Sequence, residues 1–408
     1  MSDPHILILS ANTGGGHNST AAAVREEMTR RGVTRCDVRA CLAYISEVAS
    51  EFISWGHSYV YKNLPNLFGR AYRYEENRPP QFLYETISLG AERFYRAVKD
   101  EGYDAILCVH VFAGILVTEA HRRFGYDVPF YFMATDYTCS PGVSSIEAAA
   151  AFIPAEDLRL EFTDCGVDPA RIVVSGIPIR RGFYDLPAKA EARTRLGIPA
   201  DGTVVLLSCG SMGCGRINHI APQLRRTLPE HVTLIILCGN NRRVYRQLGR
   251  KEMPNTVVVD FTREVPLYMA ASDLCISKPG GLTTTEMAAA HLPMVLMLAV
   301  PGCESRNFDF MKKRRFAVGA DDWDEVICLA AELANDPARL QAMAQRMAED
   351  PFPHGAAVTA EHILSHWERD RAAAEADSAA RAEAPAQTRA DLRAELRATD
   401  GSATARRG

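Results

Sequence analysis

Residues 273–290 read DLCISKPGGLTTTEMAAA, which is a short apolar run, a turn with two glycines and a stretch rich in helix-forming residues. Proline and glycine interrupt a strand, whereas Ala, Met and Glu favour a helix. A buried strand, a tight turn and a helix in this order form one unit of a parallel sheet that is covered on both faces. The start of the chain follows the same plan, because an apolar run at residues 5–9 leads into glycines and then into a helical pattern with Ala21, Val24 and Met28 on one face.

Further runs of strand length recur along the chain and alternate with helical segments. This alternation predicts an α/β fold with two doubly wound, Rossmann-like domains that face each other across a cleft. A polar stretch between residues 178 and 198 separates two sets of strands, so we expect one domain at residues 1–185 and a second at 186–370. The Ala-, Arg- and Glu-rich tail at 371–408 has too few apolar residues for a core, and we expect it to be disordered or a frayed helix. The further strands are expected at residues 105–109, 129–133, 171–174, 203–207, 233–237, 256–259 and 294–298.

The composition is that of an average globular protein, with 47% hydrophobic and 24% charged residues. A net charge of −4 argues against nucleic-acid binding, which needs a surplus of Lys and Arg on one face. The 11 cysteines are expected to be reduced thiols, because no two C-x-x-C pairs offer a zinc site. The sequence shows no leader and no apolar run of spanning length, so we expect a chain that starts in the cytosol and meets membranes only peripherally.

The first glycine turn, at residues 14–16, brings the imidazole of His17 to the start of a helix, where free N–H groups favour an anion. No Gly-Lys-Ser/Thr follows, and Ser19 stands where the dinucleotide fingerprint has its third glycine, so ATP and NAD sites lose their main support. An imidazole titrates near neutrality and suits a general base. The residues alone leave open whether His17 is such a base or only part of a tight strand–helix turn.

The glycine turn at Gly280 and Gly281 also lies between a strand and a helix, and Glu286 follows inside the helix. The helix start can hold a diphosphate, and Glu286 can accept both hydroxyls of a ribose. The alternative is that Glu286 only favours the helix dipole. A turn at residues 209–215 is a weaker signal of the same kind, because a packing turn explains it equally well. No clear Asp-x-Asp motif and no clustered His and carboxylate motif offers a metal site, so no metal is expected.

Eight motifs carry a resemblance to a known family. In chain order they are Gly14-Gly-Gly-His17, Val109-His110, Thr135-Asp136-Tyr137, Phe152-Ile-Pro154, Ser175-Gly-Ile-Pro-Ile-Arg180, Cys238-Gly-Asn-Asn241, Ser277-Lys-Pro-Gly-Gly281 with Glu286, and Pro301-Gly-Cys-Glu-Ser-Arg-Asn307. With these motifs, from about residue 6 to about residue 320, the chain resembles the diacylglycerol glycosyltransferases of glycosyltransferase family 28. That family includes plant monogalactosyldiacylglycerol synthase and bacterial processive diacylglycerol glucosyltransferases. The resemblance implies a GT-B fold, an acceptor on the first domain, a UDP-sugar on the second, and inversion at the anomeric carbon without a metal.

The resemblance also implies roles for single residues. His17 would lie near the acceptor hydroxyl and the reacting sugar, His110 on the cleft wall, and Asp136 where it orients or deprotonates the acceptor. The donor-binding residues would be Gly16, Gly280, Gly281 and Thr283 at the diphosphate side, Asn241 in the phosphate-side loop, Phe261 beside the uracil, Glu286 at the ribose, and Glu304 and Asn307 at the sugar hydroxyls.

The chain departs from the family pattern at three positions. The family often has Gln at the position of Cys303, Pro at that of Val111, and a basic residue at that of Asn240. The change at Cys303 removes a side-chain amide that would hydrogen-bond the donor sugar.

Residues 52–82 interleave aromatic and basic side chains, which are Trp55, Tyr59, Tyr61, Phe68, Tyr72 and Tyr74 with Lys62, Arg70, Arg73 and Arg78. Aromatic rings favour the membrane interface and cations favour anionic headgroups. The alternative is an amphipathic helix that packs these rings inward. With the resemblance, we expect a peripheral protein on the cytoplasmic side of the cell membrane, in contact with an anionic surface.

The expected reaction moves a hexose from UDP-glucose or UDP-galactose to diacylglycerol or a related lipid, with no permanently bound cofactor. Three alternatives remain open at this point. They are a UDP-N-acetylglucosamine-type epimerase, a lipid-linked N-acetylglucosaminyltransferase, and a UDP-sugar-binding protein without turnover.

Overall fold

The computed structural model describes residues 3–11, 15–44, 81–210, 217–297 and 302–383. Residues 1–360 form one compact unit that contains two sheets, and residues 361–408 form a second unit. Among the described residues, no helix is both long enough and apolar enough to cross a bilayer.

Sheet 1 is a six-stranded parallel sheet built from the first part of the chain, with the strand order β2-β1-β3-β4-β5-β6. Its strands are β1 (His5–Ser10), β2 (Arg35–Ala40), β3 (Ala105–Cys108), β4 (Phe130–Met133), β5 (Ala150–Ile153) and β6 (Ile172–Val174). The helices of this part are α1 (Gly15–Arg30), α4 (Gln81–Ser88), α5 (Ala91–Val98), α6 (Val111–Phe124) and α7 (Arg159–Asp164). Short 3-10 turns lie at Cys41–Tyr44, Val143–Ser145, Glu156–Leu158, Pro169–Arg171 and Arg181–Phe183.

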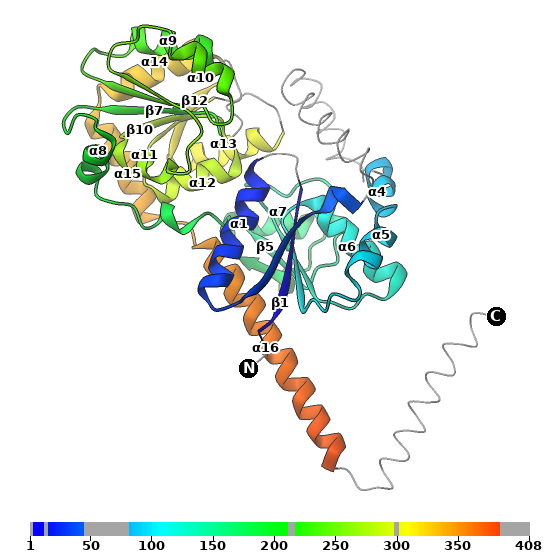
Figure 1. Ribbon diagram of the computed structural model, residues 1–408. Coiled ribbons are helices and arrows are strands. Elements are labelled where there is room, and N and C mark those ends of the chain that lie inside the picture. The colour runs from blue at the N-terminus through cyan, green and yellow to red at the C-terminus, as the bar shows by residue number, and fades with distance from the viewer. Residues whose placement is uncertain (1–2, 12–14, 45–80, 211–216, 298–301, 384–408) are drawn as a thin grey trace. The chain divides into compact units, whose positions relative to one another are not determined.

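Sheet 2 is also parallel and six-stranded, with the order β12-β11-β10-β7-β8-β9. Its strands are β7 (Val204–Ser208), β8 (Thr233–Leu237), β9 (Thr256–Val259), β10 (Leu274–Ser277), β11 (Met294–Met297) and β12 (Ala317–Ala320). Its helices are α8 (Lys189–Leu196), α9 (Ile217–Thr227), α10 (Arg242–Leu248), α11 (Val265–Ala271), α12 (Gly281–Ala289), α13 (Cys303–Lys313), α14 (Trp323–Ala334) and α15 (Pro337–Glu349). Figure 1 shows α9 and α14 on one face of this sheet and α8 and α11 on the other.

The buried strands explain why the parallel sheets form. Ile6, Leu7, Ile8 and Leu9 of β1 are all fully buried, so side chains on both faces of the strand leave water. Each such burial stabilises the fold by about 1.5–3 kcal/mol, before the entropy cost of ordering the chain. The fold is thus the predicted pair of doubly wound α/β domains, which is the GT-B architecture.

All nine strands expected from apolar runs are present within one or two residues of their predicted bounds. Three further strands were not predicted. β2 and β12 are edge strands, and an edge strand has a neighbour on one side only, so β2 can consist of polar Arg and Asp residues and β12 of small ones. β5 begins with two alanines after other alanines, and alanine favours a helix in isolation.

The last described helix is α16 (Gly355–Glu383), which begins in the first unit and continues into the second. The expected tail therefore starts as a helix, and the side chains of residues 372–380 are exposed, as in the frayed-helix alternative. Residues 384–408 lie outside the described residues. The expected domain limits at 185 and 370 stay predictions, although the first falls between β6 and β7.

Candidate active site

The strand order of each sheet reverses next to residues that the sequence singles out. In sheet 1 the reversal lies between β1 and β3, and these strands lead to His17 and His110. In sheet 2 it lies between β7 and β10, and Gly280 and Gly281 follow β10. Ligands of doubly wound sheets bind beyond the carboxyl ends of the strands at such reversals. The candidate site is therefore at these two reversals.

His17 lies in the first turn of α1, and its contacts define which ring nitrogen carries the proton. Nδ1 is 3.1 Å from the carbonyl oxygen of Val109 and 3.1 Å from Oγ1 of Thr135. Because a carbonyl oxygen can only accept, Nδ1 carries a proton, and in the neutral ring the lone pair is therefore on Nε2. Nε2 is then the atom that can take a proton from a hydroxyl.

His110 packs against His17, with ring centroids 4.6 Å apart and planes at 76°. It is the N-cap of α6, and its Nδ1 accepts a hydrogen bond of 3.0 Å from the backbone N–H of Phe112. An accepting Nδ1 is unprotonated, so the proton of a neutral His110 is on Nε2. The two neighbouring imidazoles thus have opposite tautomers, one suited to accept a proton and the other to donate a hydrogen bond.

Asp136 follows β4, and Oδ1 of its carboxylate accepts a hydrogen bond of 2.7 Å from Nδ2 of Asn307. Loss of water around the carboxylate raises its pKa to about 6. The charge of Glu304 raises this pKa as well, while the hydrogen bonds from Asn307 and the Gly281 amide lower it. A carboxylate whose pKa is close to neutrality is a stronger base than an ordinary one and is still ionised at pH 7.

Gly281 makes the closest approach between the segment after β4 and the start of α12. A Cβ atom on Gly281 would lie 2.2 Å from the carbonyl oxygen of Thr135 and 2.9 Å from Oδ1 of Asp136. Only glycine fits such a close approach of two backbones. The contact therefore brings the predicted base from sheet 1 to the helix start of sheet 2 that is predicted to hold a diphosphate.

Two helix starts meet at this place. A Cβ atom on Gly16, in the first turn of α1, would be 3.9 Å from Cβ of Leu282, in the first turn of α12. The N-terminus of each helix carries partial positive charge and N–H groups without an acceptor inside the helix. Two such ends side by side favour a ligand with more than one negative charge, such as a diphosphate.

The amides of Gly280 and Gly281 are already engaged in this structure. The N–H of Gly280 donates to the carbonyl of Lys278 at 2.9 Å, and that of Gly281 donates to Asp136. The following amides of α12, those of Leu282 and Thr283, have no acceptor inside the helix. The geometry therefore favours these two amides as diphosphate donors, while the predicted role of Gly280 and Gly281 stays a prediction.

Glu286 lies in the second turn of α12, and burial raises the pKa of its carboxyl to about 8, although the charge of Arg180 lowers it. At pH 7 this group is therefore largely protonated when no ligand is bound. Only the ionised form has both oxygens free of a proton, so that each can accept a hydrogen bond from one ribose hydroxyl. The predicted ribose contact is thus linked to the loss of a proton.

Lys278 and Glu304 form a buried ion pair, with Nζ and Oε1 3.1 Å apart and side chains 12% and 6% exposed. Glu304 lies in the first turn of α13, and Lys278 follows β10. Asn307, one turn further along α13, is fully buried. The predictions that Glu304 and Asn307 bind sugar hydroxyls stay predictions, since both side chains contact protein groups in this structure.

Asn241 and Phe261 lie at the carboxyl ends of β8 and β9. The Asn241 side chain caps α10 by accepting a 3.1 Å hydrogen bond from the N–H of Val244. The Phe261 residue is 51% exposed, which leaves its ring accessible to a flat ligand such as a nucleobase.

Most of the predicted membrane segment at 52–82, and residues 211–216 of the second glycine turn, lie outside the described residues.

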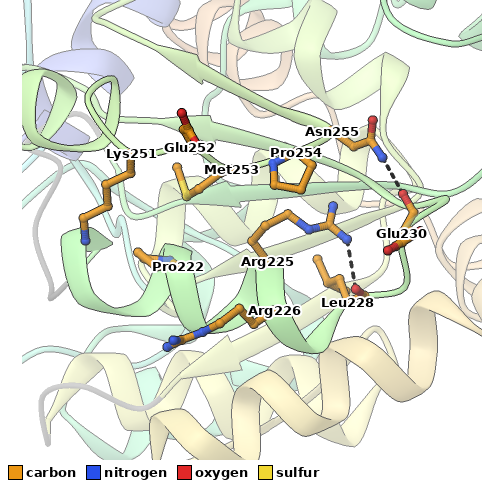
Figure 2. A pocket seen from close by; sticks show the side chains of 10 residues that line it. All are labelled: Pro222, Arg225, Arg226, Leu228, Glu230, Lys251, Glu252, Met253, Pro254 and Asn255. Carbon is orange, nitrogen blue, oxygen red and sulfur yellow. Dashed lines mark hydrogen bonds between the residues drawn. The ribbon is translucent and has the colours of Figure 1, made fainter.

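A pocket at the amino ends of the strands of sheet 2 is separate from this site, which lies beyond their carboxyl ends. Figure 2 shows it between the segments that precede β8 and β9, at the amino ends of these strands. The Arg225 guanidinium in its wall donates to the carbonyls of Val232, Leu228 and Pro229, so its charge is used to bind the backbone that follows α9.

No group of three His, Cys, Asp or Glu side chains among the described residues could hold a metal ion.

Comparison with known proteins gives two family matches. Residues 17–179 match the family model of monogalactosyldiacylglycerol (MGDG) synthase, and residues 204–301 match that of the glycosyltransferase family 28 C-terminal domain. The chain thus matches glycosyltransferase family models in both of its halves. It is therefore a glycosyltransferase, and the two models cover the two sheets in the order in which they occur along the chain.

Relatives and solved structures agree with this family. The chain is 26% identical over 348 residues to the processive diacylglycerol beta-glucosyltransferase of Bacillus licheniformis, which covers 83% of this chain and 89% of that protein. It is 22% identical to the Staphylococcus haemolyticus protein of the same name, over 86% of this chain and 89% of that protein. Acinetobacter baumannii MurG has a similar fold, with a TM-score of 0.59, 16% identity and coverage of 89% and 99%. Anabaena Alr3699/HepE in complex with UDP-glucose has a TM-score of 0.52, 17% identity and the same coverage.

Four parts of this glycosyltransferase site were not assigned from the sequence. They are the Thr135 contact with His17, the Lys278 ion pair, the Leu282 amide and the docking of Tyr137. Lys278 and Tyr137 lie inside two of the eight family motifs, and those motifs were the sequence feature that could have pointed to them. The role of the Leu282 amide follows only from where α12 begins.

Replacing Gly281 by Ala is expected to lower stability and activity together, because the new methyl group has no space against the Thr135 carbonyl. Overpacking of this kind costs about 1–3 kcal/mol. Chemical denaturation and a transfer assay measure both effects. Gly280→Ala is the matched control for stability, since nothing lies within 4 Å of a Cβ at Gly280. Equal stability of the two variants would show that the close approach is absent.

Binding of a UDP-sugar is expected to tighten with rising pH, because Glu286 must lose its proton to accept both ribose hydroxyls. With a pKa of about 8 in the free enzyme, the affinity rises as pH approaches 8 and then levels off. The gain between about pH 6.5 and about pH 8 is up to roughly fifteenfold, because the ionised fraction of a group with a pKa of about 8 rises from about 3% to about 50%. Calorimetry in buffers of different ionisation enthalpy measures the released proton. Glu286→Gln should bind with no such pH dependence, and the same dependence in this variant would rule out Glu286.

Proposed function

We propose that this glycosyltransferase moves a hexose from a UDP-sugar to the hydroxyl of diacylglycerol or a related membrane lipid. The observation that carries the proposal is the contact of Gly281 with Thr135 and Asp136. This contact places a candidate base beside a helix start that suits a diphosphate. The names of the relatives support diacylglycerol as the acceptor.

The reaction is a single displacement at the anomeric carbon. Asp136 or His17 takes the proton of the lipid hydroxyl while its oxygen attacks that carbon. The bond between the carbon and the diphosphate oxygen breaks, and its electron pair leaves with UDP. Because attack and departure occur on opposite faces, the configuration is inverted. The negative charge on the leaving group is stabilised by the Leu282 and Thr283 amides and by the two adjoining helix starts.

The remaining residues would bind and orient the substrates. Nε2–H of His110 donates a hydrogen bond to an oxygen of the sugar or the acceptor, next to the base on His17. On the donor side we assign Gly16, Asn241, Gly280, Gly281 and Thr283 to the diphosphate region, Phe261 to the uracil, Glu286 to the ribose, and Glu304 with Asn307 to the environment of the sugar.

We propose glucose as the transferred sugar. The relatives from Bacillus licheniformis and Staphylococcus haemolyticus carry the name of beta-glucosyltransferases, which supports UDP-glucose as the donor. The MGDG synthase model names a galactolipid, so UDP-galactose is the second donor to test. No permanently bound cofactor enters the proposed reaction.

The test is transfer to diacylglycerol vesicles from UDP-glucose, UDP-galactose and UDP-N-acetylglucosamine, with the lipid product identified by mass. A hexosyl diacylglycerol is the expected product. A UDP-sugar that changes without acceptor would instead indicate the epimerase alternative. Binding of UDP-glucose without any product would indicate a binding protein.

His17→Ala and Asp136→Asn are expected to reduce kcat, because each removes a candidate for the group that accepts the proton. General base catalysis contributes roughly 10²–10⁴-fold, so the loss for the true base is at least about 100-fold. Calorimetry should find UDP-glucose still bound by both variants. His231→Ala and Asp201→Asn make the same changes at exposed positions and serve as controls. Unchanged kcat in both site variants would overturn the assignment of the base.

We further propose that the enzyme works as a peripheral protein on the cytoplasmic side of the cell membrane, at an anionic surface. Changing Lys62, Arg70, Arg73 and Arg78 to Gln is then expected to weaken sedimentation with phosphatidylglycerol vesicles, by about 1 kcal/mol per charge. Arg226, Arg246, Arg250 and Lys251 are exposed in the second half and provide a control that removes the same charge. Equal loss in both variants would mean that only net charge matters.

A further inference from the structure

We propose that Asn307 is a positioning residue, which orients the Asp136 carboxylate from the side of the donor-binding half. The proposal rests on the proposed function only where it takes Asp136 as the base. Asn307 lies on α13, which follows β11 of sheet 2, whereas Asp136 follows β4 of sheet 1. The two residues are 171 positions apart in the chain.

Both the oxygen and the nitrogen of the Asn307 amide form hydrogen bonds. Oδ1 accepts from the backbone N–H of Tyr137 at 2.7 Å, and Nδ2 donates to Oδ1 of Asp136 at 2.7 Å and to the carbonyl of Pro279 at 3.0 Å. The orientation of the amide is fixed, because a flipped group would place its NH₂ against an N–H donor and its oxygen against a carbonyl. A fully buried side chain that must accept on one side and donate twice on the other has to be an amide.

The backbone around Asp136 is docked by its neighbour Tyr137. The Tyr137 hydroxyl lies 2.8 Å from Oγ1 of Thr285 on α12, and its ring stacks on Phe310 of α13 with centroids 4.3 Å apart. These contacts hold the segment, but they leave the side-chain torsion of Asp136 free. The bond from Asn307 engages Oδ1 and, together with the bond from the Gly281 amide, restrains that torsion.

The charges around Asp136 make this bond matter for the protonation of the carboxylate. Glu304 and the Cys303 thiol approach it from α13, with Lys278 paired to Glu304. The Tyr137 phenol lies next to it in the chain, and His17 contacts the preceding Thr135 from α1. Burial and Glu304 favour the protonated acid, whereas Asn307 and the Gly281 amide favour the ionised base. Removal of Asn307 therefore raises the pKa of Asp136 above its present value of about 6.

The test variant is Asn307→Leu, which keeps the shape and removes the hydrogen bonds without adding a charge. The rate of the wild type falls as pH drops through the pKa of Asp136. In the variant this acid limb should move to higher pH by about one unit, because the loss of one hydrogen bond to the ionised form raises a pKa by about that amount. At pH 7 kcat falls, and part of the loss is recovered at higher pH. A lower kcat with an unmoved acid limb would overturn the proposal.

Thr285→Val is the matched control, since it removes the other hydrogen bond that docks this segment and leaves Asp136 untouched. It should lower thermal stability without moving the acid limb. Should Asn307→Leu fail to bind UDP-glucose, Asn307→Asp replaces it, keeps the acceptor for Tyr137, and is expected to raise the pKa of Asp136 further. An unmoved acid limb in that variant also overturns the proposal.

A readout that does not depend on activity separates this proposal from the proposed function. The Asp136 carboxyl is titrated by ¹³C NMR in aspartate-labelled enzyme, with Asp136→Asn giving the assignment. A raised pKa in Asn307→Leu supports the positioning role even when Asp136→Asn remains active, an outcome that would remove only the assignment of Asp136 as base. If the pKa of Asp136 is unchanged in Asn307→Leu, the positioning role is wrong, whether or not the variant is active.

Discussion

The contact between the Thr135 carbonyl and Gly281 fixes how the two sheets meet at the candidate site. It leaves no space for a Cβ atom, so the backbones of the two segments lie directly against each other. The acidic side chain that follows Thr135 is thereby held within hydrogen-bonding distance of α13 and the start of α12. The Asp136 carboxylate and the N-terminus of α12 therefore come together through this one approach.

Two carboxylates at the candidate site are buried, and the loss of water raises the pKa of each. The pKa of Asp136 is raised to about 6 and that of Glu286 to about 8. The two groups have different tasks in the proposed reaction: Asp136 must be ionised before the acceptor attacks, whereas Glu286 can lose its proton as the nucleotide arrives. Their separate environments, one with a buried amide donor and the other without, account for the difference between the two values.

Much of the fold could be predicted from the sequence, because buried parallel strands are continuous apolar runs that local pattern reveals. The edge strands β2 and β12 escape this reasoning, because β2 carries Arg and Asp and β12 consists of small residues, so neither is a run of large apolar side chains. In the site, His17 and the glycines are local signals at strand ends. The hydrogen bond between Asn307 and Asp136 is not a local feature, since 171 positions separate the two residues. The pattern of residues around one of them does not indicate that it contacts the other. Only the packing of the two sheets reveals it.

The ion pair of Lys278 and Glu304 restricts how this corner of the molecule can change. Both side chains are almost completely shielded from water, so replacing one of them would strand an opposite charge in a medium that solvates it poorly. Loss of a single partner in such a pair typically costs about 3–5 kcal/mol, while exchange of both for well-packed apolar groups is often neutral. An exchange of this pair would therefore have to alter two segments of the chain at once, the one that follows β10 and the start of α13.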